Sequence, residues 1–248
     1  MDINLETVNR ELDNAPALTV LEWCYNTFPK DKITLSTSFG AEGMVVLHML
    51  VSLVKTPRVF TIDTGRLFQE TYDVWQQVVD TYNIRIDTFF PDKDAVHEMV
   101  SAQGPNLFYR SVENRKRCCY IRKVVPLKAA LADADVWITG LRREQSEARQ
   151  DVPRVSYNHE HNVYKICPLV DWTEFDVWEY IRNNNVPYDT LHDKGYRTIG
   201  CCPCTRPVRP AEDIRSGRWW WEQKESRECG IHIEEGKLTR KKPPSFTI

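Results

Sequence analysis

Residues 33–54, ITLSTSFGAEGMVVLHMLVSLV, set the architecture that the sequence predicts. The segment opens with apolar and β-branched residues typical of a buried strand, continues through a turn of Ser, Thr and Gly, and enters an apolar helix near Ala41. A strand, a small-residue turn and the start of a helix together form a cradle of backbone N–H groups that binds anions. We therefore expect an α/β domain with an anion-binding loop around Ser36 and Ser38. The alternative for this loop is an ordinary turn between a strand and a helix.

Further strands and helices alternate along the chain. Strands are expected over 58–62, 84–89 and 136–140, with a two-stranded ribbon within 154–166. Helices are expected within 3–29, after Gly65, over 94–102, over 115–131 and within 171–189. Alternation at this spacing predicts right-handed βαβ units and a mostly parallel sheet. Leu18 and Phe175 are placed among the inward-facing apolar positions of their helices.

The composition favours one domain with a C-terminal tail. A chain of 248 residues with 42% hydrophobic content can bury a sizeable core. Beyond Pro210 the sequence becomes charged and aromatic, and its end, KLTRKKPPSFTI, is too polar to hold itself in place by burial. We therefore expect an α/β domain over 1–210 and a tail over 211–248 that becomes ordered when a substrate or partner binds.

Charge and segment composition narrow the range of partners. The formal net charge of −2 gives no general attraction to nucleic acid or to a membrane, so the basic clusters near Cys118 and Arg215 are local features suited to a small anion. The N-terminus lacks signal-peptide character, and the longest apolar run, 44–54, is too short to span a bilayer. Eight cysteines without an export signal are expected to serve a metal or catalysis in a reducing cytoplasm.

Four of the cysteines form a candidate metal site. Cys201 and Cys204 make a C-x-x-C motif, and Cys118 and Cys119 are adjacent within a basic helix. Successive side chains on a helix diverge by roughly 100°, which fits poorly with the tetrahedral geometry of a single zinc ion. An iron-sulfur cube accepts neighbouring thiolates more readily, because its irons occupy separate corners, and four cysteines are its usual ligands.

The other four cysteines differ in their surroundings. Cys229 lies in a polar tail beside an arginine and three residues before His232, and nearby cations make a thiol more acidic and more nucleophilic. Cys24 and Cys167 lie in apolar segments and are expected to be buried. Cys202, between two proposed ligands, is expected to point away from the metal.

Polar residues follow the ends of the predicted strands. Ligands of a parallel sheet bind at the carboxyl ends of its strands, which puts the Ser36 loop and Asp63 on the same rim. Arg142 and Arg149 come just after another strand, and a forked guanidinium matches phosphate and sulfate oxygens in pairs. The alternatives are a helix cap for Asp63 and a solvated surface for any single arginine.

Four motifs together carry a resemblance to a known family. These are KRCCYIRKVVPL (116–127), GCCPCTRPV (200–208), RSGRWWWE (215–222) and ECGIH (228–232). The chain resembles, from about residue 36 to 232, the assimilatory adenylyl-sulfate (APS) reductases, the iron-sulfur branch of the APS/PAPS reductase family. The resemblance implies an adenine-nucleotide hydrolase-like (PP-loop) domain with a mobile C-terminal tail.

The resemblance also implies a cofactor and a reaction. Cys118, Cys119, Cys201 and Cys204 would hold a 4Fe-4S cluster in the nucleotide-binding domain, and Cys229 in the tail would take the sulfo group of adenylyl sulfate. Thioredoxin or a similar dithiol would then release sulfite, in sulfate assimilation toward cysteine. The groups expected to bind the anionic substrate are Ser36, Ser38, Asp63, Lys123, Arg142, Arg149, Arg215, Arg218 and His232.

Several alternatives stay open. The Ser36 loop lacks the Gly-Gly and Asp of the ATP-cleaving pattern SGGxDS, which weakens any claim to ATP pyrophosphatase chemistry. The chain could act on the 3'-phosphorylated substrate (PAPS) or on both substrates, or it could be a nucleotide-binding iron-sulfur or zinc sensor. Tryptophans 219–221 are expected to pack at the root of the tail, with stacking on an adenine as the alternative. The oligomeric state is open, and a homo-oligomer is one possibility.

Overall fold

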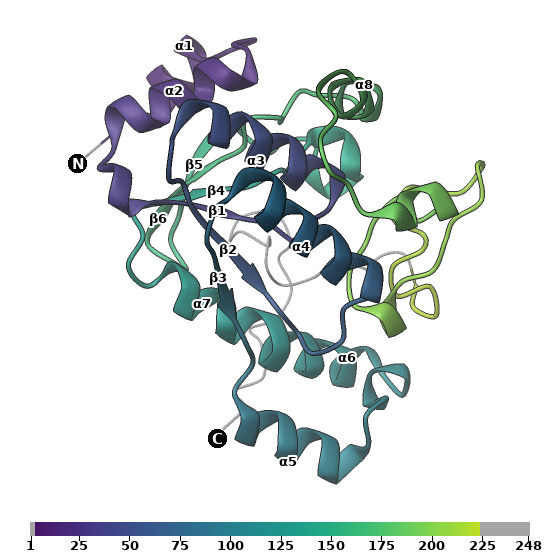
Figure 1. The fold of residues 1–248 in the computed structure, drawn as a ribbon. Helices are drawn as coiled ribbons and strands as arrows, with labels where there is room; N and C mark the ends of the chain where they lie inside the picture. The colour runs from purple at the N-terminus through teal and green to yellow at the C-terminus, as the bar shows by residue number, and fades with distance from the viewer. Residues whose placement is uncertain (1–2, 224–248) are drawn as a thin grey trace.

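A six-stranded sheet forms the centre of residues 3–223, which are the residues that the computed structural model describes (Figure 1). The strands are β1 Ile33–Ser36, β2 Arg58–Ile62, β3 Ile86–Phe89, β4 Val136–Ile138, β5 Val155–Asn158 and β6 Val163–Ile166. Their order is β3-β2-β1-β4-β6-β5. Neighbouring strands are parallel except for the β5–β6 ribbon. The expected mostly parallel α/β sheet is confirmed.

The connecting segments are helical. The α-helices of the described residues are α1 Leu5–Glu11, α2 Ala17–Thr27, α3 Ala41–Leu53, α4 Gln69–Tyr82, α5 Lys93–Gln103, α6 Val112–Cys119, α7 Val125–Leu131 and α8 Glu174–Asn184. Helix α8 begins with a capping box in which the Thr173 hydroxyl accepts from the Asp176 N–H and the Asp176 carboxylate accepts from the Thr173 N–H. Within residues 3–223, no helix combines the length and the apolar character that crossing a membrane requires.

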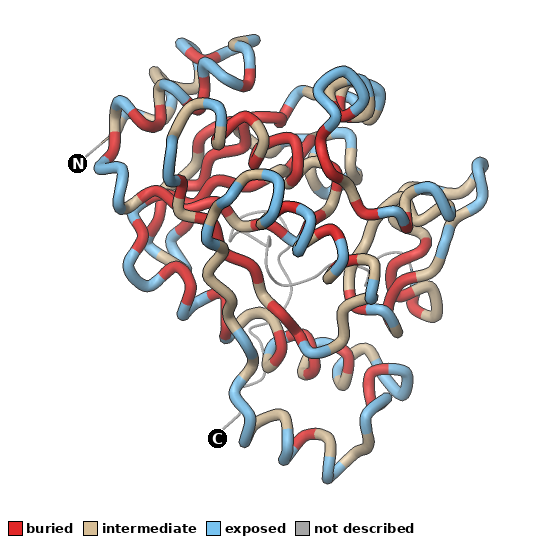
Figure 2. Tube along the Cα trace, in the orientation of Figure 1, coloured by how far each residue is buried: buried red, intermediate tan, exposed pale blue. Residues whose placement is uncertain are grey.

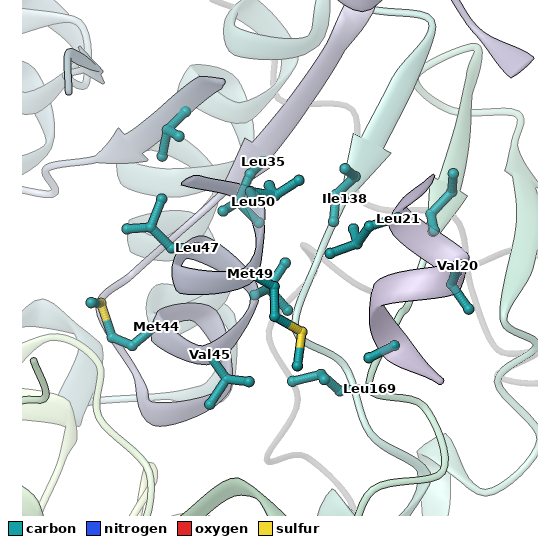
Figure 3. Packing of buried hydrophobic residues seen from close by; sticks show 14 of the residues in the cluster. Val20, Leu21, Leu35, Met44, Val45, Leu47, Met49, Leu50, Ile138 and Leu169 are labelled. Atoms are coloured by element: carbon teal, nitrogen blue, oxygen red, sulfur yellow. The ribbon is translucent and has the colours of Figure 1, made fainter. Parts of the chain in front are cut away.

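The alternation of side chains along the strands divides the core between the two faces of the sheet. On one face, Leu35 and Ile138 meet apolar side chains of α2 and α3, a packing that Figure 3 shows from close by. On the other face, Trp137 packs with Leu127 and Leu131 of α7. Burial is concentrated in the central strands and in α3 (Figure 2). Fully burying one such side chain stabilises the fold by about 1.5–3 kcal/mol.

A side chain from α1 covers one edge of the sheet. The Asn9 amide donates to the Val155 carbonyl oxygen at 2.8 Å and accepts from the Val155 N–H at 3.0 Å, as a neighbouring strand would. These two bonds satisfy backbone groups of β5 that would otherwise be exposed at the edge. The N-terminal helices therefore have a structural role.

The helix expected over 115–131 is interrupted. Helices α6 and α7 are joined by a π-helical turn over Tyr120–Val124. Pro126, in the first turn of α7, has no N–H to offer the carbonyl of Arg122, and its ring would crowd that carbonyl in a regular α-helix. The backbone widens just before the proline, directly after the paired cysteines.

Two apolar positions were predicted wrongly. Phe175 is 65% exposed and Leu18 is 40% exposed, although both were expected to face inward. In α8 the buried residues are Val177 and Ile181. Residues two apart on a helix differ in direction by about 200°, so Phe175 faces away from the side of α8 that Val177 buries. Leu18 has the same relation to Val20, which is buried in α2.

Candidate active site and cysteine pocket

Four cysteines from two distant segments line one pocket. Cys118 and Cys119 come from the end of α6, while Cys201 directly precedes the short 3-10 turn Cys202–Cys204 and Cys204 ends it. Each of the four is buried, with 7–9% of its surface exposed. Cys202 is exposed and does not line the pocket. The structure therefore brings together the four thiols that the sequence singled out.

The loop after β2 holds the two cysteine segments together. The Thr64 hydroxyl lies 3.3 Å from the Cys201 sulfur. The N–H of Cys202 donates to the Arg66 carbonyl oxygen at 2.8 Å. On the other side, the Arg122 guanidinium donates to the Thr64 carbonyl oxygen at 2.6 Å. One short loop therefore contacts both cysteine segments and also begins at the strand end that carries Asp63.

Burial keeps at least two of these thiols protonated in the absence of a metal. It raises the pKa of Cys204 to about 12, with a further contribution from neighbouring Cys201. It also raises the pKa of Cys118, although the positive charges of Arg122 and Lys123 oppose the shift. A thiol that coordinates a metal is deprotonated outright. Such buried thiols suit metal ligands better than free nucleophiles.

Several buried hydrogen-bond donors around the pocket have no partner among residues 3–223. They are Arg122 Nε, Arg218 Nε, Trp219 Nε1 and Trp221 Nε1. Arg122 lines the pocket and is 9% exposed, while Trp219 belongs to the same buried cluster as the four cysteines and is 1% exposed. An unpaired buried donor carries a penalty of about 1–3 kcal/mol, so this surrounding fits a bound group that is rich in acceptor atoms.

The side chains that could ligate a metal also indicate which kind of metal group fits the pocket. In the part of the chain described, no three or more His, Cys, Asp or Glu side chains are arranged to hold one metal ion. Thiolates and inorganic sulfides of an iron-sulfur cluster accept hydrogen bonds, which tune its potential. Four thiols among unpaired donors have the chemistry such a cluster requires.

The loop between β1 and α3 lies at the carboxyl end of the sheet. The Ser36 hydroxyl accepts from the Trp137 indole N–H at 2.7 Å, and Ser38 is exposed. Helix α3 begins after Gly40, which has no side chain to cap the first N–H groups of the helix. A 13-residue helix that starts in this way at the end of a strand has the geometry of an anion-binding turn. Substrate binding by Ser36 and Ser38 stays a prediction.

Asp63 lies at the end of β2 on the same rim. Its carboxylate accepts from the Gly65 N–H at 2.7 Å and from the Tyr72 hydroxyl at 3.0 Å. Helix α4 does not begin until Gln69, so Asp63 caps a turn and not the helix. Burial and the bond to Asp63 raise the pKa of Tyr72 to about 12, which keeps its hydroxyl a donor.

Arg142 is held by carboxylates of the protein itself. Its guanidinium contacts Glu42 at 2.9 Å and Glu144 at 2.9 Å, and it also donates to the Trp172 carbonyl oxygen at 3.1 Å. The side chain is 2% exposed. Burial alone would raise the pKa of Glu42, but the charge of Arg142 and a hydrogen bond from Gln145 outweigh it and hold that pKa below its ordinary value. Arg142 therefore ties its loop to the start of α3.

The other predicted anion-binding groups lie either in the network around Arg142 or near the cysteine pocket. Arg149 donates to Gln145 and thereby joins the network around Arg142. Lys123 lines the cysteine pocket. The Arg218 guanidinium lies 4.7 Å from the Trp219 ring centroid and donates to the Ile199 carbonyl oxygen at 3.3 Å. The roles of these groups and of the half-buried Arg215 in binding substrate stay predictions. Cys229 and His232 lie outside the described residues.

One pair at the site was not predicted from the sequence. Arg115 of α6 and Glu222 form a bidentate ion pair, with Nε–Oε1 at 2.9 Å and Nη2–Oε2 at 2.8 Å. The segment that follows the cysteine turn therefore packs against the helix of the other cysteines, as the green-to-yellow trace beside α6 shows in Figure 1. Trp219 is a core residue of this contact, which agrees with packing at the root of the tail. The proposed boundary at residue 210 stays a prediction.

The protein is an α/β domain with a mostly parallel sheet. At its candidate site, the loops at the carboxyl ends of the strands lie beside a pocket of four cysteines. A family model described as the phosphoadenosine phosphosulfate reductase domain matches residues 32–207. The chain belongs to this family, which confirms the resemblance that its motifs indicated.

Similar proteins extend this assignment. The chain is 46% identical over 203 residues to an adenosine 5'-phosphosulfate reductase of Burkholderia cepacia, covering 82% of this chain and 81% of the relative. It is 46% identical over 205 residues to an adenosine 5'-phosphosulfate reductase of Allochromatium vinosum, covering 83% and 80%.

Solved structures give the same fold. A phosphoadenylyl-sulfate reductase from Candida auris, in a phosphate complex, superposes with a TM-score of 0.72 at 28% identity and covers 84% of this chain and 99% of its own. A Candida glabrata FMN adenylyltransferase superposes with a TM-score of 0.58 at 12% identity, covering 98% of this chain and 80% of its own. The second likeness concerns the fold alone, which is the expected type.

Proposed function

We propose that the protein reduces adenylyl sulfate to sulfite and AMP with electrons from a dithiol such as thioredoxin. The observation that carries this proposal is the pocket in which Cys118, Cys119, Cys201 and Cys204 meet beside the loop rim of the sheet. Relatives at 46% identity over most of the chain are named adenosine 5'-phosphosulfate reductases, which supports the same substrate here.

Cys229 is the proposed nucleophile. Its thiolate attacks the sulfur of the sulfo group, so that an S–S bond forms while the S–O bond to the phosphate breaks, and AMP leaves with the electron pair. A thiolate of the dithiol then attacks the Cys229 sulfur, and sulfite leaves with the electron pair of the S–S bond. The second thiol of the reductant resolves the mixed disulfide and restores Cys229. The two electrons come from the dithiol.

Cations offset the charge that would repel an anionic nucleophile from an anionic substrate. We propose this role for Lys123, which lines the cysteine pocket, and for Arg149, which donates to Gln145, together with Arg215, Arg218 and His232. Ser36, Ser38 and Asp63 are proposed to bind the nucleotide at the strand ends. For Arg142 we propose a positioning role, because Glu42, Glu144 and a backbone carbonyl already occupy its guanidinium.

The four cysteines are proposed to hold a 4Fe-4S cluster. When bound, it would supply a fixed electrostatic environment and would cross-link two segments of the chain; the electrons of the reaction do not pass through it. Arg122, Trp219 and Trp221 have the unpaired donors that its sulfurs could accept from. Thiols that must stay reduced fit a cytoplasmic reaction.

The second candidate function is reduction of PAPS, or of both nucleotides. The observation in its favour is the superposition on the Candida auris phosphoadenylyl-sulfate reductase, which covers 99% of that chain. The higher identity to the adenosine 5'-phosphosulfate reductases favours adenylyl sulfate. A nucleotide-binding sensor is the remaining alternative and would release no sulfite.

Sulfite release from anaerobically purified protein with thioredoxin and each nucleotide separates these candidates. We expect kcat/KM for adenylyl sulfate to exceed that for PAPS. A tenfold preference for PAPS, about 1.4 kcal/mol in transition-state binding, would assign the protein to the second candidate. If neither nucleotide gives sulfite, the nucleotide-binding sensor is the remaining candidate. Light scattering during the same purification would give the oligomeric state and would distinguish a monomer from a homo-oligomer.

A further inference from the structure

We propose that the Arg115–Glu222 ion pair positions the nucleophile. It would fix the start of the C-terminal segment against the helix that carries Cys118 and Cys119, and would thereby set the reach of Cys229. The inference rests on the proposed function, because it takes Cys229 as the residue that receives the sulfo group.

The pair is buried and geometrically specific. The side chains of Arg115 and Glu222 are 1% and 2% exposed, and two parallel N–H···O contacts of 2.9 and 2.8 Å join them. The Arg115 guanidinium also lies 4.7 Å from the centroid of the Trp219 ring. A planar fork on a carboxylate fixes both distance and orientation, so the pair holds the two segments in one relative arrangement.

The pair is one of several contacts that fasten this segment beside the cysteines. The backbone N–H of Trp219 donates to the Cys204 carbonyl oxygen at 3.1 Å, and Thr205 and Arg218 form an isolated β-bridge. Arg115 itself lines the pocket of the four cysteines. Glu222 is therefore separated from that pocket by a single side chain.

Cys229 follows this anchor closely in the sequence, since 229 minus 222 is seven residues. Seven residues span at most about 25 Å even when fully extended. The rate of an attack within one chain depends on how the tether confines the reacting group, and a misplacement of 1 Å can slow a reaction about 100-fold. An anchor at Glu222 therefore limits the positions that the Cys229 thiol can reach.

Stability alone is a poor reason for this pair. Replacing a buried ion pair by apolar side chains of similar volume is often neutral or stabilising, whereas removing one partner is strongly destabilising. An apolar contact is not directional. A double replacement therefore separates the two roles, because it can keep the packing while it removes the fixed geometry.

The test compares four variants with the wild type. Arg115→Met/Glu222→Leu replaces the pair by apolar side chains, and Glu222→Asp keeps the charge but shortens the arm by one methylene. Glu222→Gln removes the charge alone. Glu212→Gln is the matched control, because it removes a half-buried ion pair with Arg206, 3.0 Å long, from the same segment.

The measurements are iron content, melting temperature, the dissociation constant of AMP, and the single-turnover rate of sulfo transfer to the chain at saturating adenylyl sulfate. We expect the double variant and Glu222→Asp to keep wild-type iron content and to bind AMP within about 2-fold, yet to accept the sulfo group at least about 10-fold more slowly. Glu222→Gln should show the same defect with a lower melting temperature. The control should match the wild type in every measurement.

A double variant or a Glu222→Asp variant that accepts the sulfo group at the wild-type rate would overturn the positioning role. A variant that loses AMP binding or iron to the same extent as it loses the rate of sulfo transfer would also overturn the positioning role. The pair would then be only structural. A wild-type protein that acquires no sulfo group is a different result, because it would refute the proposed function itself.

Discussion

The rim of the sheet and the cysteine pocket lie side by side but differ in how their polar groups are satisfied. On the rim, Arg142 and Glu42 bind each other, although the buried Ser146 hydroxyl of the same loop has no partner among residues 3–223. Around the pocket, Arg122 and Trp219 keep buried donors that no residue of 3–223 accepts from. A closed network is rigid and complete by itself, whereas buried unpaired donors indicate a missing partner. We therefore expect the Arg142–Glu42 part of the rim to be preformed and the pocket to be built around an added group.

The largest effect should come from removing a thiol of the pocket. Cys201→Ser should reduce the iron content of anaerobically purified protein from about four atoms per chain, the number in a cubane cluster, to near zero. Loss of the cluster should also abolish sulfite release, because the two cysteine segments would no longer be joined. Cys202→Ser is the control, since Cys202 is exposed and outside the pocket. A colourless wild-type protein with one zinc ion would refute the cluster.

The rim should respond to substitution through stability first. Arg142→Met leaves the Glu42 carboxylate without its cation and should reduce the free energy of unfolding by about 3 kcal/mol. Arg149→Met should change that free energy by less than about 1 kcal/mol but raise the dissociation constant of adenylyl sulfate about 10-fold. Urea unfolding and equilibrium binding measure the two quantities. An Arg142 variant of normal stability with weak binding would instead make Arg142 a substrate ligand.

A smaller effect is expected where β4 approaches α3. A Cβ on Gly140 would lie 2.9 Å from the backbone carbonyl carbon of Glu42, closer than packed atoms allow. Gly140→Ala should therefore reduce the free energy of unfolding by about 1–3 kcal/mol. Gly40→Ala is the matched control, because a Cβ there meets nothing within 4 Å. Equal stability of the two variants would show that the rim can move to accept the extra Cβ, which would contradict a rigid, preformed rim.

The smallest effect concerns pH. The pKa of Glu42 is held below its ordinary value, so Glu42 stabilises the folded protein above the pKa of the unfolded chain, about 4.3. That contribution is lost as pH falls through the lower folded pKa. The wild type should therefore be more stable than Glu42→Gln at pH 7, and the difference should shrink below about pH 4. Melting temperatures of both proteins across this range give the difference, and a constant difference would contradict the shift.

Local patterns in the sequence predicted the architecture well. The strand at 58–62 and the ribbon within 154–166 have the expected places, and α3 begins at Ala41 as predicted. These elements depend on periodicity and turn chemistry, which neighbouring residues determine. The strand expected over 136–140 ends at Ile138, where the chain leaves the sheet for the rim.

Features that depend on distant residues could not be predicted in the same way. The spacing of cysteines indicated which thiols would meet, because metal ligands leave a motif. An ion pair such as Arg115–Glu222 joins residues 107 positions apart and leaves no motif. Arg142 was expected to bind substrate because its position after a strand was visible, while its partner Glu42, 100 residues away, was not. Pro126 was the available signal for the interrupted helix.

The central claim is that Cys229 takes the sulfo group from adenylyl sulfate. Intact-mass analysis of the wild type, mixed with adenylyl sulfate and no dithiol, tests it most directly. We expect one sulfo group on the chain and one AMP released, then no further reaction until thioredoxin frees sulfite. Cys229→Ser should keep its iron and bind nucleotide but acquire no sulfo group, because a Ser hydroxyl is far less ionised than a thiol near pH 7. A sulfo group on the Ser variant, or one mapped to Cys202 in the wild type, would contradict the claim.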